Sequence, residues 1–388
     1  MCLAVAALPS AALAQVAVDA RIDSIFTTWN LETSPGCAVG VYRDGAIRFA
    51  KGYGMSNLEH GIPITPSSIF HVASISKQFA AMSIALLARE GRLSLDDDAR
   101  KYVPELPDFG KRIMIRHLLY HTSGLRDQWE LLSLAGWRAD DPKSEADILS
   151  LLGRQQELNF EPGAKYLYSN SGYTLLAVIV QRVTGQTLRN FTESRIFRPL
   201  GMTRTHFHDD HTMVVPGRTA AYVQRAGGWA ISIPVFDNHG ATSLFTTVED
   251  LGKWDANFDA PIVGDVGVIE QMQTRGRLND GSTIDYALAL THGEVRGLRT
   301  VGHSGSDAGY RADYFRVPDA DVSFVTLCNT PANAGELNRR VAAVFLGDRM
   351  APPAQPRGPA PAQDGRAVVA RPPRPIRERS PARGTAKS

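Results

Sequence analysis

Residues 71–83 read HVASISKQFAAMS, and the string SISK at positions 74–77 decides how the rest of the chain is interpreted. From Lys77 onward, apolar residues recur every three or four positions until a glycine is reached, which predicts a helix over residues 77–90. Ser74 and Lys77 are three residues apart, so we expect both side chains to lie on one face where this helix begins.

Ser74 and Lys77 together are the residue types of a serine nucleophile activated by a lysine base. A serine hydroxyl attacks poorly until a neighbouring base removes its proton. A lysine can serve as that base if burial and nearby positive charge lower its pKa, and the helix start adds positive potential beside Ser74. The string alone is weak, because an N-cap serine followed by a solvated lysine gives the same letters.

A second stretch, YLYSNSGYTLL at residues 166–176, places Tyr168 and Asn170 in a loop just before an apolar helix. A tyrosine hydroxyl near cations can relay a proton, and an asparagine amide can hold a lysine or a substrate carbonyl. Taken alone, the same residues describe a packed tyrosine and a helix N-cap.

A third stretch, VGHSGSDAGYRADYF at residues 301–315, follows a strand pattern, and its residues from Gly302 to Ser306 are small apart from His303. A substrate backbone could lie along that edge. The backbone N–H of Ser306, together with that of Ser74, could form an oxyanion hole. The alternative interpretation is a turn.

Strand patterns lie near both ends of the chain and mostly helical patterns lie between them. An early hairpin is predicted over residues 37–54 with its turn at Arg43-Asp44-Gly45, and late strands over residues 291–305, 310–317 and 321–329. We therefore expect one antiparallel sheet built from distant segments, a helical lobe beside it, and a cleft between them.

In this order and context, the three stretches resemble the serine β-lactamase and penicillin-binding protein superfamily. The resemblance runs from Ile22 to Leu346 and is closest to the branch with class C enzymes, DD-peptidases and related esterases. It implies an α+β fold, with five or more antiparallel strands flanked by helices and a mostly helical lobe at about residues 78–280. Supporting stretches are GYGMSNLEHGIPITPSSIF, IRHLLYHTSGL, FEPGAKYLYSN and PLGMTRTHF.

The resemblance also implies roles for the site residues. Ser74 would form an acyl-enzyme, and Lys77 and Tyr168 would share the general base and general acid work. Asn170 would orient Lys77 and the substrate amide, and the oxyanion would sit between the amides of Ser74 and Ser306. No cofactor is implied.

The third element departs from the pattern of that superfamily. His303, Ser304 and Gly305 stand where the family carries Lys-Thr-Gly. A lysine is a permanent cation that grips a substrate carboxylate, whereas an unperturbed histidine is mostly neutral at pH 7. This departure weakens the case for an efficient β-lactamase and leaves D-amino-acid peptides, β-lactams and small esters open as substrates. A slowly deacylating penicillin-binding sensor, or a module that binds peptidoglycan fragments, is the non-enzymatic alternative.

The two ends of the chain differ from the middle in composition. Residues 1–14 form an apolar run with an A-x-A-like end, which predicts a signal peptide and export to the periplasm or the extracellular space. Residues 15–348 form the hydrolase domain. Residues 349–388 hold nine of the 23 prolines and many arginines, which is typical of a disordered tail.

The folded part has no basic bias, so nucleic acid is not expected as a partner. No segment after the predicted signal peptide is long enough to span a membrane.

A cluster at residues 205–211, THFHDDH, offers His206, His208 and His211 with two aspartates between them. Its spacing matches the H-x-H-x-D-H string of metallo-β-lactamase-type hydrolases. A dinuclear site needs further ligands on an αββα sandwich, which this chain does not offer. We therefore interpret the cluster as a polar loop, with a metal-dependent hydrolase as a remote alternative.

Two cysteines remain after the predicted signal peptide, Cys37 and Cys328, both in strand-like runs. This number excludes a disulfide scaffold. We expect two buried free thiols, with a single bridge as the alternative.

Overall fold

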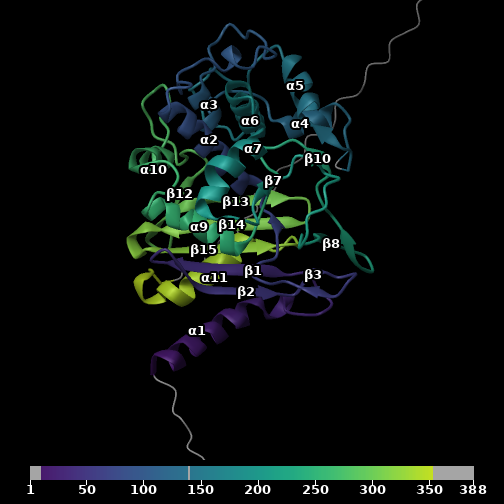
Figure 1. Ribbon diagram of the computed structural model, residues 1–388, viewed down its shortest axis with the longest axis vertical. Coiled ribbons are helices and arrows are strands. Elements are labelled where there is room, and N and C mark those ends of the chain that lie inside the picture. Colours follow the sequence, from purple (N-terminus) through teal and green to yellow (C-terminus); the bar gives the residue numbers. More distant parts are fainter. Residues whose placement is uncertain (1–9, 139, 353–388) are drawn as a thin grey trace, which may run out of the picture. The chain divides into compact units, whose positions relative to one another are not determined.

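A six-stranded antiparallel sheet runs through the centre of the computed structural model, which describes residues 10–138 and 140–352 (Figure 1). Its strand order is β12-β13-β14-β15-β1-β2, so the first hairpin lies beside the last strand. The strands are β1 Cys37–Arg43, β2 Ala46–Tyr53, β12 Thr291–Val295, β13 Leu298–Asp307, β14 Tyr310–Val317 and β15 Val322–Cys328. The predicted hairpin, late strands and antiparallel sheet are confirmed.

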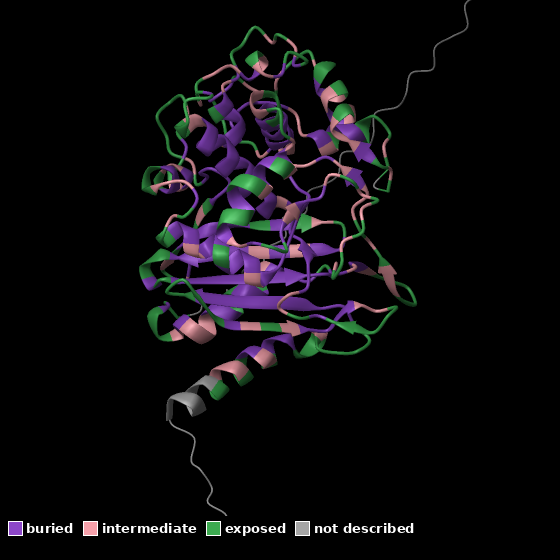
Figure 2. Ribbon diagram, viewed as in Figure 1, coloured by how far each residue is buried: buried purple, intermediate pink, exposed green. Residues whose placement is uncertain are grey.

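Both faces of this sheet are buried, and alternate residues of a strand supply the two cores. On β1, Cys37, Val39 and Val41 belong to one core, whereas Ala38 and Tyr42 belong to the other. This alternation follows from the period of two along a strand. The β1 strand therefore reads as nearly continuous apolar sequence, with every residue before Arg43 buried (Figure 2).

Helices from distant parts of the chain cover the two faces. Helix α1, Ser10–Phe26, packs against helix α11, Ala334–Leu346, and α11 lies on β14 and β15. The opposite face is covered by helix α9, Val248–Asp259, which contacts β1, β2 and β15. The hydroxyl of the N-cap residue Thr247 accepts the amide of Asp250, which fixes the start of α9.

A mostly helical region lies beyond α9 and packs around two long helices. These are α2, Lys77–Arg89, and α6, Asn170–Thr184, and they contact one another. The surrounding helices are α3 Ile115–Leu119, α4 Gln128–Leu134, α5 Glu145–Gly153, α7 Leu188–Thr192, α8 Arg198–Leu200 and α10 Val266–Gln273. The remaining strands are short: β3 Met55–Asn57, β4 Ile62–Pro63, β5 Phe70–His71, β6 Lys143–Ser144, β7 His206–Phe207, β8 Tyr222–Arg225, β9 Gly228–Ile231, β10 Phe236–Asp237 and β11 Leu244–Thr246. The α+β class is confirmed.

The expectation of two free thiols is wrong. Cys37 and Cys328 form a disulfide between the first and the last strand of the central sheet. They are direct partners in the β1–β15 register and both are fully buried. Cysteines that face one another across two strands come within bonding reach. The sequence predicted both strands but not their register, and the register creates the bridge.

Some expectations for the chain ends lie outside the described residues. These are most of the predicted signal peptide, at residues 1–9, and most of the predicted tail, at residues 353–388. Residues Ser10 to Ala14 belong to helix α1. Within residues 10–352 no helix has the length and apolar character required to cross a bilayer. The domain boundaries at residues 15–348 remain a prediction.

Candidate active site

Ser74 lies in a 3-10 turn, Ala73–Ser76, that leads directly into helix α2 at Lys77. The predicted helix start is therefore a tighter turn with Ser74 on its exposed side. Ala73 adopts a positive φ of 47°, a region that alanine rarely occupies. The Ser76 hydroxyl donates to the Ala73 carbonyl and accepts the amide of Leu244, which fixes the turn against strand β11. This backbone holds Ser74 at the wall of a pocket.

Lys77 is fully buried directly beside Ser74. Its Nζ atom is 3.1 Å from Ser74 Oγ, 2.9 Å from Asn170 Oδ1 and 2.6 Å from the carbonyl oxygen of Ala241. Burial lowers the pKa of this amine to about 7, and the carboxylate of Asp127 opposes the shift. At neutral pH a large fraction of Lys77 is therefore unprotonated and able to accept a proton.

Asn170, the first residue of helix α6, connects Lys77 to a carboxylate. Its Oδ1 accepts from Lys77, and its Nδ2 donates to Asp127 Oδ2 at 2.8 Å. The Asn170 backbone amide donates to the same oxygen at 2.6 Å. Asp127 therefore fixes both the start of α6 and the orientation of the Asn170 amide, so that its oxygen faces Lys77.

The amine of Lys77 lies over the ring of Tyr168, with Nζ 4.9 Å from the ring centroid. Its hydroxyl is buried and has no hydrogen-bond partner among the described residues. Burial raises the pKa of this phenol above its ordinary value, and the nearby Ser74 hydroxyl opposes that shift. The phenol therefore stays protonated at neutral pH, which suits it to donate a proton rather than to accept one.

His303 is held by hydrogen bonds on both ring nitrogens. Nδ1 lies 2.6 Å from the carbonyl oxygen of Ser304, so Nδ1 carries the proton, and Nε2 accepts from the hydroxyl of Tyr286 at 3.1 Å. The same hydroxyl lies 3.1 Å from Nε2 of His121, whose Nδ1 accepts the amide of Ser169. These contacts form one continuous chain of neutral donors and acceptors.

The environment of His303 also disfavours its charged form. Burial lowers the pKa of its imidazole to about 4, and the positive charge of Lys77 acts in the same direction. Neither nitrogen has a hydrogen free for a ligand. The pocket therefore lacks the cation that a lysine would supply at this position.

The segment from Ser304 to Ser306 on strand β13 faces the turn that carries Ser74. A Cβ atom on Gly305 would lie 2.2 Å from the carbonyl oxygen of Val72 and 3.1 Å from the amide nitrogen of Ser74. Only glycine permits this approach. The glycine at position 305 is thus required by the packing of the strand against the turn.

All eight residues expected at the site line one pocket of about 870 Å³ or, for Lys77, contact the residues that do. The pocket also has an aromatic side that includes Trp129, Trp137 and Phe236. Four further residues at the site were not predicted from the sequence: Asp127, His121, Tyr286 and Asp307. His121 lies in the stretch IRHLLYHTSGL, whereas Tyr286 carries no local signal.

The histidine cluster lies apart from this pocket. None of residues 205–211 is among the described residues that line it. His206 belongs to strand β7, and burial lowers the pKa values of His206 and His208 to about 4. Among the described residues, the one group with metal-ligand spacing is Asp210, His211 and Asp237, in which Nδ1 of His211 contacts Asp237 Oδ1 at 2.9 Å.

Comparison with known protein families gives one match across most of the chain. The model of the family described as Beta-lactamase matches residues 29–348. The chain belongs to the beta-lactamase family. This beta-lactamase family member is 28% identical over 313 residues to a D-aminopeptidase of Brucella anthropi, a match that covers 81% of this chain and 59% of the relative. A D-aminopeptidase of Gluconobacter oxydans is 27% identical over 315 residues, with the same coverage. The chain thus spans less than two thirds of these curated relatives.

Solved structures show the same fold for this beta-lactamase family member. An octameric penicillin-binding protein homologue from Pyrococcus abyssi has a TM-score of 0.73 at 25% identity, covering 87% of this chain and 78% of that chain. A D-amino acid amidase from Ochrobactrum anthropi SV3, complexed with D-phenylalanine, has a TM-score of 0.73 at 22% identity, covering 86% of this chain and 100% of that chain. The predicted superfamily is confirmed.

Proposed function

We propose that this protein is a serine acyl-hydrolase that forms an acyl-enzyme on Ser74 and acts on D-amino-acid amides and short peptides. One observation carries the proposal: a buried lysine amine, with its pKa near neutrality, lies 3.1 Å from a pocket-lining serine hydroxyl. A solvated lysine beside an N-cap serine would have neither the burial nor the fixed contacts to Asn170 and Ala241.

Acylation begins with Ser74. Its Oγ attacks the carbonyl carbon of the substrate, and the Oγ proton passes to neutral Lys77. We assign this base role to Lys77 because its amine contacts Oγ and is partly neutral at pH 7. The carbonyl oxygen becomes an oxyanion, which the backbone amides of Ser74 and Ser306 would stabilise.

Collapse of the tetrahedral intermediate breaks the carbon–nitrogen bond of the amide. The leaving amine takes a proton from the Tyr168 phenol, and Lys77, which was protonated in the first step and lies against the Tyr168 ring, returns its proton to the phenolate. Water then attacks the ester on Ser74 and gives up a proton to Lys77. The acid is released, and Ser74 recovers its hydroxyl proton.

The choice of substrate class rests on the neutral third element and on the relatives. A β-lactam carries a carboxylate that a lysine at position 303 would hold, and His303 offers no cation and no free N–H group. Because D-aminopeptidases are among the relatives, we favour substrates that release an amino acid instead. Small esters remain useful as test substrates because their chemistry uses the same steps.

A hydrolysis panel tests the proposal. It contains a D-Ala-D-Ala peptide, D-amino-acid amides, 4-nitrophenyl butyrate and a cephalosporin, each measured with the wild-type protein and with Ser74→Ala. We expect the wild-type protein to turn over the amides fastest and to show an acyl adduct on Ser74 by mass spectrometry. We expect the Ser74→Ala variant to be inactive. Full activity of the variant overturns the mechanism. A single equivalent of product without turnover identifies a slowly deacylating sensor instead.

We also propose that the protein is exported. The buried disulfide between Cys37 and Cys328 supports this, because such bonds persist in oxidising compartments. Fractionation of the producing cells tests it, since retention of the whole pool in the reducing cytoplasm would contradict export.

A further inference from the structure

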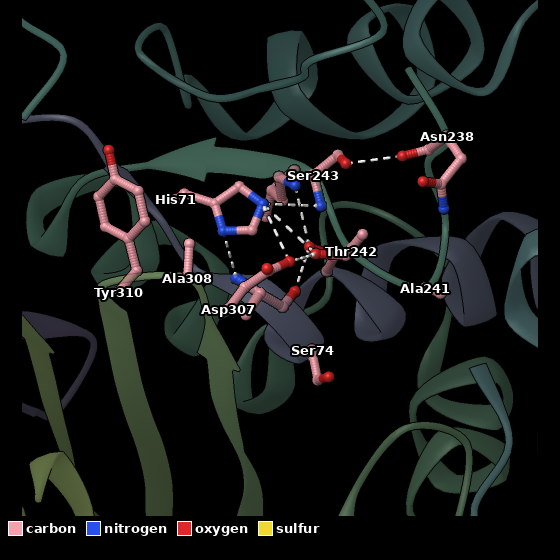
Figure 3. A network of polar contacts seen from close by, with 12 residues as sticks. His71, Ser74, Asn238, Ala241, Thr242, Ser243, Asp307, Ala308 and Tyr310 are labelled. Atoms are coloured by element: carbon pink, nitrogen blue, oxygen red, sulfur yellow. Dashed lines mark hydrogen bonds and ion pairs between the residues drawn. The ribbon is translucent and has the colours of Figure 1, made fainter. Parts of the chain in front are cut away.

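A carboxylate lies in the wall of the active-site pocket without a role in the steps above. Asp307 ends strand β13, directly after Ser306, and lines the same pocket as Ser74. Figure 3 shows its side chain in a network with His71 and Thr242, with Ser74 drawn below. About 20% of the Asp307 side chain is exposed, so the carboxylate is reachable from the pocket.

The fixed partners of Asp307 are neutral. Its Oδ2 accepts from the hydroxyl of Thr242 at 2.9 Å and lies 4.0 Å from Nε2 of His71. Burial lowers the pKa of His71 to about 3, so this imidazole is uncharged at neutral pH. Among the described residues no lysine or arginine lies within ion-pair distance of Asp307.

The cations around Asp307 are held elsewhere. Lys77 on α2 is bonded to three acceptors, as described above. Arg311 on β14 donates to the carbonyl oxygens of Ala308 and Tyr310. Lys143 on β6 donates to the carbonyl oxygens of Arg138 and Asp141. A carboxylate that is partly desolvated and lacks a direct cationic partner favours a cation that arrives with a ligand.

We propose that Asp307 binds the free α-ammonium group of the substrate's acyl residue and so selects amino-acid amides over plain acyl amides. Asp307 follows the residue whose amide would hold the oxyanion, so it lies on the strand along which the acyl group extends. An aromatic wall stands nearby, since Phe236 contacts both His71 and Trp129. The wall would take an apolar side chain of the same acyl residue. This inference rests on the proposed function and refines its substrate class.

A purely positioning role for Asp307 makes a different prediction. Asp307 holds Thr242, and the neighbouring Ala241 carbonyl holds Lys77. If Asp307 acted only through this connection, its loss would slow all substrates alike. If it binds ammonium, its loss slows only substrates that carry the ammonium.

The test compares two anilides at pH 7, D-phenylalanine 4-nitroanilide and 3-phenylpropionyl 4-nitroanilide, which lacks the amino group. The wild-type ratio of their kcat/KM values is compared with that of Asp307→Asn, which keeps an acceptor for Thr242 but removes the charge. We expect the ratio to fall on the order of 30-fold or more, mainly through KM. An unchanged ratio overturns the proposal. If the kcat/KM values of both anilides fall by the same factor, Asp307 has a positioning role instead.

A matched control and a binding measurement complete the test. Asp313→Asn neutralises another buried carboxylate, on the adjacent strand and outside the pocket, and should leave the ratio unchanged. Titration calorimetry of D-phenylalaninamide into Ser74→Ala, with and without Asp307→Asn, measures ammonium binding without catalysis. Loss of affinity with Asp307→Asn supports the proposal, and equal affinity overturns it. Failure of the proposed function appears separately, as activity that survives Ser74→Ala.

Discussion

Lys77 places its amine 3.1 Å from the hydroxyl of Ser74 and yet has no exposed surface. Burial is the main reason that the pKa of this amine falls to about 7. The amine must be neutral to take the Ser74 proton, so kcat/KM for an uncharged ester should rise with pH and level off above the pKa of Lys77. A pH profile with 4-nitrophenyl butyrate measures the midpoint.

The same profile has an internal control. Asp127 raises the pKa of Lys77, so Asp127→Asn should move the midpoint to lower pH. A wild-type profile that is flat across neutral pH, or a midpoint that moves upward in the variant, would contradict the role assigned to Lys77.

Gly305→Ala should remove most of the activity while the protein stays folded. The added Cβ would lie 2.2 Å from the carbonyl oxygen of Val72, so strand β13 and the turn carrying Ser74 must separate. A displacement of this kind costs about a hundred-fold in kcat/KM. Gly347→Ala is the control, because its Cβ meets nothing within 4 Å. Circular dichroism checks folding, and equal activity of both variants would show that the close approach is not needed.

Loss of the disulfide should lower stability and leave the chemistry in place. The bond joins positions that are 291 residues apart. The double substitution Cys37→Ala and Cys328→Ala should therefore lower the free energy of unfolding by about 2–5 kcal/mol. Urea denaturation measures this. The wild-type protein, titrated with a thiol reagent in urea, should show no thiol from either position, and two additional thiols would disprove the bridge.

Arg316 should be important for stability because it pairs with a buried carboxylate. Its Nε donates to Asp255 Oδ1 at 3.0 Å, and both side chains are less than 10% exposed. Arg316→Met leaves Asp255 charged and buried, which we expect to lower the free energy of unfolding by about 3–5 kcal/mol. Arg299→Met, which breaks the exposed pair with Asp319, should change little. Equal effects in thermal denaturation would contradict the importance of burial.

A chelator should not affect hydrolysis. The residues with metal-ligand spacing, Asp210, His211 and Asp237, lie outside the pocket that holds Ser74. We expect dialysis against EDTA to leave the rate with D-amino-acid amides unchanged, and His211→Ala to behave in the same way. Loss of hydrolysis on chelation, with acylation of Ser74 retained, would instead support a metal-dependent role for the histidine cluster.

Local patterns predicted the parts of the site that are continuous in sequence. The spacing of Ser74 and Lys77 required only one turn of chain, and the structure places their side chains in contact. The strand around His303 was predicted from its pattern, whereas the loss of a cation there was inferred from the resemblance to the superfamily. Local pattern was sufficient because each of these features depends on residues that are close together in the chain.

Features that depend on register or on loop packing could not be predicted. The pairing of Cys37 with Cys328 follows from which strands are neighbours, and sequence periodicity does not fix that order. Tyr286 lies in a segment without regular structure, and only its packing against His121 and His303 gives it a role. Asp307 has no local sequence signal, and only the packing of the pocket places it beside Ser74.

The strand order has a consequence for biosynthesis. The turn with Ser74 is made early, whereas strand β13, which packs against that turn, is among the last parts of the domain to be made. A nascent or truncated chain thus holds Ser74 and Lys77 without Ser306, whose amide is proposed to stabilise the oxyanion. Pairing across such sequence distances is slow. We therefore expect the proposed hydrolysis to begin only when the final strands are in place.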